Sequence, residues 1–253
     1  MMNENVIFQK VNIQDFNDGV KIIRNSFSAN YLLTSIYSCN GVIHYLEEEY
    51  YNHFSTYVYF GLYNNNQIIA FAEFKLNKNY STAFLNMIAV DKNLINNKLG
   101  TLLLSKCIDN LNKKGYKYLE LDVYSSNNSA LNWYKKLGFQ EEFENIYYEI
   151  PTNNLEFENQ NFDFQILNYP QTKVVVEKFG FGMIVCSHLG DTFNFGIINK
   201  NLIIRKLINE DYYNWLVPIM RIFHLNKAYC FGKYDNNLLI ERDKVKRLKL
   251  ALQ

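Results

Sequence analysis

The segment from Tyr118 to Phe139 constrains the fold more than any other part of this 253-residue chain. Apolar and polar side chains alternate from Tyr118 to Tyr124, which is typical of a strand with one buried face. From Ser129 to Leu137 the apolar residues recur at helical spacing, and Gly138 is the type of residue that ends a helix. The segment therefore predicts a strand that leads directly into a short helix.

The same alternation of strands and helices extends over residues 1–150. Asn64-Asn65-Asn66 stands between two strand-like runs and predicts a hairpin, because asparagine tolerates the left-handed backbone of tight turns. The expected strands are Val6–Val11, Thr56–Tyr63, Gln67–Leu76, Ala83–Val90, Tyr118–Tyr124 and two more up to Ile150; the expected helices are 13–27, Val42–Phe54, Leu99–Leu111 and Ser129–Leu137.

Residues 151–160 are polar, rich in asparagine and bounded by a proline, which predicts a linker. Beyond it we expect a smaller α+β domain over residues 161–253. Four expected strands form an antiparallel meander: Lys173–Val176, Phe179–Ser187, Thr192–Ile198 and Leu202–Ile208. A helix at Glu210–Leu225 and one more strand, Ala228–Tyr234, follow them. Near the C-terminus a helix, a turn, a strand and a pair of asparagines follow one another in the same order as in the first domain. A degenerate duplication of the first domain is therefore an alternative interpretation of the second. The expected fold class is mixed α/β, in two domains.

Composition excludes several classes of protein. With 48% hydrophobic residues, 20% charged residues and a net charge of +1, the chain is neither disordered nor collagen-like, and it lacks the positive field of a nucleic-acid binder. Apolar runs are too short to span a membrane. The four cysteines and four histidines are scattered without ligand spacing, so we expect no metal site, no disulfide framework and a cytoplasmic location.

The pattern of Asn127, Ala130, Tyr134 and Leu137-Gly138-Phe139 after a strand closely resembles the second signature block of the GNAT superfamily of acetyl-CoA-dependent N-acetyltransferases. The order of elements up to Ile150 agrees with that fold, a central mixed sheet flanked by helices. The resemblance implies that acetyl-CoA is the co-substrate and that a primary amine attacks the thioester directly.

The resemblance also implies roles for individual residues. Tyr134 matches the tyrosine that protonates the departing thiolate, and Asn127 matches an asparagine near the pantetheine arm. The backbone of Ile88, Ala89 and Val90 matches the strand that hydrogen-bonds the pantetheine.

The loop that binds pyrophosphate in the family corresponds to Asn96, Asn97, Lys98, Leu99, Gly100 and Thr101. Ile95 replaces the family Arg or Gln, Lys98 replaces the first glycine, and only Gly100 of the glycine pair remains. Backbone N–H groups at a helix start can still bind an anion. The alternative interpretation is an exposed cap before a core helix.

Asp122 is the leading candidate for the base that deprotonates the amine, because relatives acting on protein N-termini carry Glu at this place. Glu73, Glu120 and His44 are alternatives. The acceptor, a small molecule or a peptide amine, stays open, and the second domain either completes the acceptor cleft or mediates dimerisation. A second hypothesis is a non-catalytic binding module with the same fold.

Overall fold

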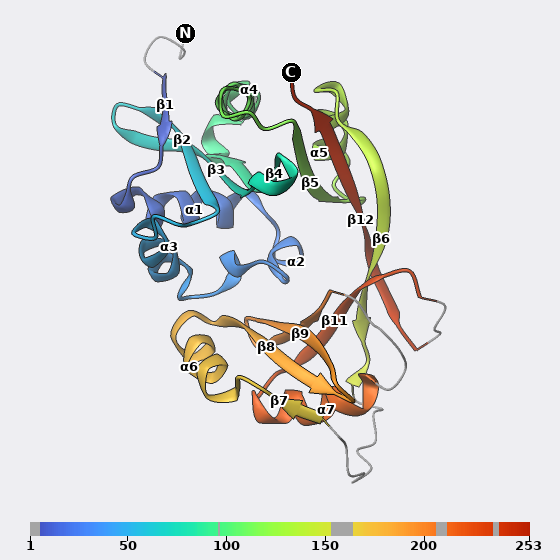
Figure 1. Cartoon of the computed structure of the whole chain (residues 1–253). Coiled ribbons are helices and arrows are strands. Elements are labelled where there is room, and N and C mark those ends of the chain that lie inside the picture. The colour runs from blue at the N-terminus through green and yellow to red at the C-terminus, as the bar shows by residue number, and fades with distance from the viewer. Residues whose placement is uncertain (1–5, 96, 153–163, 206–211, 235–237) are drawn as a thin grey trace. The chain divides into compact units, whose positions relative to one another are not determined.

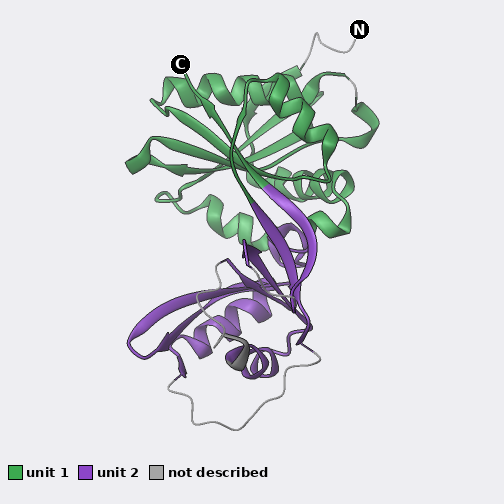
Figure 2. Cartoon of the chain, turned by 90° about the vertical axis from the view of Figure 1, so that its right-hand side faces the viewer, with its two compact units in different colours: residues 1–32, 43–144, 246–253 green, residues 33–42, 145–245 purple. Residues whose placement is uncertain are grey.

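The computed structural model describes residues 6–95, 97–152, 164–205, 212–234 and 238–253, and the chain forms two compact units (Figures 1 and 2). Unit 1 contains residues 1–32, 43–144 and 246–253, and unit 2 contains residues 33–42 and 145–245. Residues 153–160 of the expected linker lie outside the described residues. The last eight residues, which the sequence places after the linker, group with unit 1.

The sheet of unit 1 has the strand order β1-β2-β3-β4-β5-β12-β6. The pairs from β1 to β4 are antiparallel, whereas β4 and β5 are parallel. The strands are β1 (Val6–Lys10), β2 (Tyr57–Asn64), β3 (Gln67–Asn77), β4 (Thr82–Val90), β5 (Tyr118–Tyr124), β6 (Gln140–Ile150) and β12 (Ile240–Ala251). β6 and β12 have residues in both units.

Helices cover both faces of this sheet (Figure 1). The buried face of α4, with Leu103, Leu104 and Cys107, packs on the same core as Ala72 of β3 and Leu121 of β5. On the other face Gly19 of α1 meets the Phe71 ring so closely that no Cβ would fit. The helices are α1 (Phe16–Ser26), α2 (Ala29–Leu32), α3 (Val42–Tyr50), α4 (Leu99–Lys113) and α5 (Asn128–Lys136), with 3-10 turns at Ile13–Asp15, Ile36–Ser38, Lys78–Tyr80 and Lys92–Leu94.

The expected elements of residues 1–139 are present within a few residues. In the β2–β3 hairpin, Asn65 and Asn66 have φ values of 48° and 62°, the left-handed backbone that the asparagine run predicts. The two strands expected before Ile150 are one continuous strand, β6.

Unit 2 contains β7 (Phe164–Ile166), α6 (Tyr169–Phe179), β8 (Phe181–His188), β9 (Asp191–Ile198), β10 (Asn201–Ile204), α7 (Tyr212–Ile222) and β11 (Lys227–Gly232). Its strand order is β6-β11-β10-β9-β8-β7. The expected antiparallel meander holds from β8 to β10, and β7, which the sequence did not indicate, adds one more antiparallel strand beside β8. The strand expected after the helix is β11, and it lies parallel to β10 because α7 connects the two.

Both units share one order of elements. A strand and helical segments come first, followed by three antiparallel strands, a further helix and a final strand. In each unit this final strand, β5 or β11, is parallel to the third antiparallel strand, β4 or β10. β5 and β11 occupy the same place in the two series. The topology therefore agrees with the alternative of a degenerate duplication. The paired asparagines Asn236 and Asn237 lie outside the described residues.

One expected strand in the second half is wrong. Lys173–Val176 belongs to α6, because Pro170 stands at the first turn and Gly180, at φ 83°, ends the helix. The three consecutive valines that suggest a strand lie partly at the surface, with Val174 63% exposed. The basic segment from Lys244 to Lys249 is part of β12.

The four cysteines are buried, and none of them forms a disulfide with a described residue. Burial raises the pKa of the Cys186 and Cys230 thiols to about 12. Among the described residues, no helix is long and apolar enough to cross a membrane, and no cluster of His, Cys, Asp and Glu could hold a metal ion.

Candidate active site

The two parallel strands at the centre of unit 1 pair over only part of their length. Their register runs from Thr82 opposite Tyr118 to Leu85 opposite Leu121. Beyond this point β4 continues along β3 to Val90, while its pairing with β5 ends within the described strands. Ile88, Ala89 and Val90 lie in this unpaired stretch. The Val90 carbonyl accepts a 3.0 Å hydrogen bond from Ser26 Oγ, and the other backbone groups of β4 that face β5 here are available to a ligand inserted between the strands.

A bulge in β4 lies at the point where the strands part. Glu73 pairs with Met87 and Phe74 with Leu85, so Asn86 is the extra residue. Asn86 Nδ2 donates a hydrogen bond of 2.7 Å to Glu73 Oε1. The bulge thus places an amide and a buried carboxylate, only 3% exposed, beside the opening.

The predicted phosphate loop leads from β4 into α4. Lys98 is the N-cap and has φ 58° and ψ 13°, a left-handed backbone that favours glycine. Asn97 Nδ2 donates to the Leu94 carbonyl at 3.2 Å. The chain therefore keeps a glycine-like turn although a lysine occupies it. Asn96 lies outside the described residues.

The first turn of α4 packs against the end of β4 and against α5. A Cβ on Gly100 would lie 3.6 Å from Val90 Cγ2 and 3.7 Å from the Trp133 ring. Thr101 Oγ1 accepts a 3.0 Å hydrogen bond from Trp133 Nε1. Leu99 is buried in the core. These contacts bring the loop and the helix that carries Tyr134 together.

Tyr134 lies on the inner face of α5. Its ring centroid is 4.7 Å from that of Trp133 and 5.3 Å from that of Phe139. Burial raises the pKa of Tyr134 well above its ordinary value of 10.0. The hydroxyl therefore keeps its proton at neutral pH and can donate it.

Asn127 begins α5. Its side chain accepts a 3.1 Å hydrogen bond from the Ala130 N–H, which satisfies one of the unpaired donors at a helix start. Asn127 thereby fixes the start of the helix that carries Tyr134.

Asp122 lies on the face of β5 opposite the buried residues Leu121 and Val123, which is called the outer face below. Arg247 of β12 binds its carboxylate. Arg247 donates from Nε to Oδ1 at 2.5 Å and from Nη2 to Oδ2 at 3.0 Å. The same guanidinium reaches Glu120 at 3.4 Å, and Lys249 Nζ lies 3.3 Å from Glu120. Both candidate carboxylates of β5 are therefore ion-paired.

Glu73 lies among tyrosines of α3 and β2. Burial, followed by the charges of Glu49, Tyr57 and Glu73, raises the pKa of Tyr45 to about 12. Burial and the charge of Glu73 also raise the pKa of Tyr57 and Tyr59. These phenols stay protonated at neutral pH and leave the negative charge on this face to the carboxylates. His44, also on α3, lies within 3.7 Å of Glu47 and 3.6 Å of Glu48.

Sequence reasoning missed Asn86 and Arg247. A bulge depends on how two strands pair, so nothing in β4 alone indicates Asn86. Arg247 carried a usable signal, because charged and apolar residues alternate from Arg247 to Leu250 as in a strand with one buried face.

Residues 28–139 match the model of the acetyltransferase (GNAT) family. The [ribosomal protein bS18]-alanine N-acetyltransferase of Escherichia coli strain K12 is 39% identical over 85 residues, which are 34% of this chain and 56% of that protein. The chain thus spans about half the length of the curated relatives it matches.

Two solved structures are similar. A tandem GNAT protein from the clavulanic acid biosynthesis pathway, solved without AcCoA, has a TM-score of 0.70 and is 8% identical, with 98% of this chain and 99% of that chain covered. The PaiA N-acetyltransferase from Thermoplasma acidophilum, in complex with coenzyme A, has a TM-score of 0.47 and is 22% identical, with 55% and 91% covered. The tandem protein shares the fold alone.

The family match lies within the part of the chain that holds the parted strands, the glycine-like turn and the Tyr134 helix. Residues 28–139 of this chain belong to the acetyltransferase (GNAT) family.

Proposed function

We propose that this protein is an N-acetyltransferase that uses acetyl-CoA to acetylate a primary amine by direct transfer. The parting of β4 and β5 beyond Leu85 and Leu121 supports this most strongly, because it opens a slot lined by unpaired backbone in the middle of a sheet. A sheet whose neighbouring strands pair along their whole length has no such slot. Buried backbone N–H and C=O groups cost free energy when they lack a hydrogen-bond partner, so a ligand in the slot would stabilise them.

The residues present fit coenzyme A. The β4 backbone from Ile88 to Val90 faces the slot and would hold the pantetheine. The turn at Lys98 and the N–H groups of the first turn of α4, including Gly100 and Thr101, would hold the pyrophosphate. Lys98 adds a positive charge at this turn.

In the proposed reaction the amine nitrogen attacks the thioester carbonyl, the new C–N bond forms and the C–S bond breaks. Tyr134 donates its proton to the departing thiolate. Its raised pKa keeps the phenol protonated at neutral pH, so a proton is available when the thiolate departs.

Two carboxylates are proposed as acceptors of the amine proton. Asp122 is the residue that the sequence favours, but a guanidinium already engages both its oxygens. Glu73 is buried beside the bulge and accepts from the neutral amide of Asn86. An amide competes less strongly with an incoming proton than a guanidinium does, so the geometry favours Glu73. Comparing the pH profiles of Asp122→Asn and Glu73→Gln separates the two.

The first test is a calorimetric titration of the full chain with acetyl-CoA. We expect micromolar binding that is lost in Gly100→Trp, because the indole would fill the space between Val90 and Trp133. Ser105→Trp, at an exposed position later in α4, is the matched control and keeps binding. Absence of heat even at millimolar acetyl-CoA would overturn the proposal and favour the non-catalytic binding module.

A further inference from the structure

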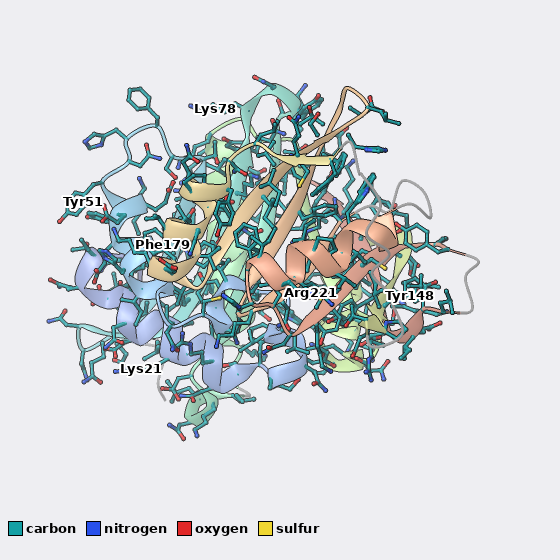
Figure 3. The ribbon with its side chains drawn as sticks, turned by 90° about the horizontal axis from the view of Figure 1, so that it is seen from below. Lys21, Tyr51, Lys78, Tyr148, Phe179 and Arg221 are labelled. Carbon is teal, nitrogen blue, oxygen red and sulfur yellow. The ribbon has the colours of Figure 1, made fainter. Side chains whose placement is uncertain are left out.

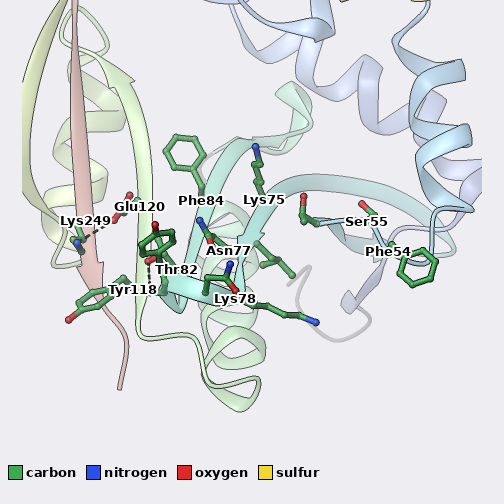
Figure 4. Close-up of a pocket in the computed structure, with 14 residues that line it drawn as sticks. Phe54, Ser55, Lys75, Asn77, Lys78, Thr82, Phe84, Tyr118, Glu120 and Lys249 are labelled. Carbon is green, nitrogen blue, oxygen red and sulfur yellow. Dashed lines mark hydrogen bonds and ion pairs between the residues drawn. The ribbon is translucent and has the colours of Figure 1, made fainter. Parts of the chain in front are cut away.

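A cavity of about 890 Å³ lies on the outer face of the unit 1 sheet (Figure 4). Its walls come from the turn between α3 and β2, the β3–β4 hairpin, the start of β5 and the end of β12. Lys75 and Phe84 project to the same side from neighbouring strands. Lys78, Glu120 and Lys249 also line it. No role described so far uses this cavity.

The cavity carries positive charge that its own carboxylate does not balance. Lys249 lies 3.3 Å from Glu120 and 2.9 Å from Glu142, and Glu120 also faces Arg247. Lys75 and Lys78, by contrast, form no ion pair with any carboxylate in the described parts of the chain. Lys78 is exposed, and its side chain is labelled in Figure 3. Two lysines therefore remain to bind an anion.

Aromatic rings border the same cavity. Phe54 is 95% exposed and Tyr80 is 75% exposed, although both are large apolar or partly apolar side chains. Such exposure of two aromatic rings that line one cavity is typical of a surface that contacts a ligand.

The cavity ends where the parted strands begin. Phe84 pairs with Glu120, and the next pair, Leu85 with Leu121, is the last before β4 and β5 separate. Lys75 and Glu73 share one face of β3 at a spacing of about 7 Å, since a strand rises about 3.3 Å per residue. A ligand in the cavity can thus place one end beside Glu73 and Asn86.

We propose that this cavity is the acceptor subsite and that it selects a peptide whose carboxylate lies a few residues after the reacting amine. Lys75 and Lys78 bind that carboxylate, and the rings of Phe54 and Tyr80 pack along the peptide. Lys78 begins the 3-10 turn that follows β3, so it lies at most about 16 Å along the chain from Glu73, and an extended peptide spans up to about 3.5 Å per residue. The carboxylate therefore belongs about two to five residues from the amine. This inference rests on the proposed function.

The test uses two peptides with free amino ends and amidated carboxyl ends, Ala-Ala-Asp-Ala and Ala-Ala-Asn-Ala, which differ only in one charge. We expect the wild-type chain to acetylate the Asp peptide with a KM about tenfold lower. The double variant Lys75→Gln/Lys78→Gln should lose this preference and keep its kcat on the Asn peptide. Lys106→Gln/Lys113→Gln, which removes two exposed lysines from α4, is the matched control and should keep the preference.

An equal Asp-to-Asn ratio in the wild type and in the cavity variant would overturn the subsite. If neither peptide is acetylated, a titration with each peptide in the presence of coenzyme A separates the two proposals. Preferential binding of the Asp peptide that the cavity variant loses would support the subsite although transfer fails. No binding of the Asp peptide, or binding of a single-stranded oligonucleotide in its place, would overturn it.

Discussion

Arg247 on the last strand of the chain donates two hydrogen bonds to the carboxylate of Asp122 on β5. Asp122 is 37% exposed and Arg247 is 24% exposed, so water screens the pair only in part. Phe84 and Phe143 flank the guanidinium, with ring centroids 4.8 Å and 5.3 Å from Cζ. The C-terminal strand thereby controls the charge on the outer face of β5.

Removing this guanidinium should destabilise the fold. Arg247→Met leaves Asp122 without the guanidinium that binds both its oxygens, while Glu120 keeps Lys249, and we expect a loss of about 2 kcal/mol in the free energy of unfolding. The double variant Arg247→Met/Asp122→Asn should recover part of that loss, because it removes one unpaired charge. Urea denaturation of the wild type, the two single variants Arg247→Met and Asp122→Asn, and the double variant measures this interaction as a double-mutant cycle. Strictly additive losses would contradict a direct interaction.

The phenol of Tyr134 should matter for turnover and not for folding. Tyr134→Phe removes only the hydroxyl, and the ring keeps its packing against Trp133 and Phe139. We expect kcat to fall at least about 100-fold while affinity for acetyl-CoA stays unchanged. Tyr116→Phe, another buried tyrosine of the same core, is the control and should retain its kcat. Equal kcat values for the two variants would remove Tyr134 from the reaction.

The left-handed turn at Lys98 should make glycine the more stable residue there. Lys98→Gly relieves a backbone conformation that costs a non-glycine residue about 1 kcal/mol, so the free energy of unfolding should rise by about that amount. Lys106→Gly, in the middle of α4, should lower it by about 1 kcal/mol. Thermal unfolding of both variants is the measurement. Shifts of the same sign would show that Lys98 is not strained.

Unit 2 should lose stability in acid through Glu149. Burial acts to raise the pKa of Glu149, but hydrogen bonds from Lys227 and Arg242 outweigh it and hold that pKa below its usual 4.5. A carboxylate with a lowered pKa in the folded state stabilises the fold above the unfolded value, and this contribution disappears as the pH falls through the folded pKa.

Urea midpoints measured from neutral pH down to about pH 3 should therefore fall more steeply for the wild type than for Glu149→Gln. Glu177→Gln removes an exposed carboxylate of α6 that has no ion pair among the described residues, and it should follow the wild-type curve. Parallel curves for wild type and Glu149→Gln would refute the role of this pair.

The sequence predicts those strands and helices whose apolar residues repeat at regular spacing within the element itself. The strand from Tyr118 to Tyr124 and the helix after it each show a clear period, and Gly138 marks the helix end at φ 91°. Tyr134 and Asn127 follow from that same stretch, and the altered turn at Lys98 follows from the loop between β4 and α4. Their positions needed no knowledge of distant contacts.

The remaining features depend on contacts between distant residues. Val174 and its two valine neighbours have strand propensity, yet Pro170 and Gly180 delimit a helix. The ion pair of Arg247 with Asp122 joins residues 125 positions apart. The bulge at Asn86 and the parallel pairing of β10 with β11 depend on how strands pair, so the local spacing of apolar residues does not predict them.

The place of β12 between β5 and β6 has a consequence for synthesis of the chain. Residues 246–253 complete unit 1, although they are translated after all the other residues of both units. Until they emerge from the ribosome, β5 and the start of β6 each present an unpaired edge, and open strand edges are sites of aggregation. A nascent chain truncated before Lys246 should therefore need chaperone protection that the finished chain does not.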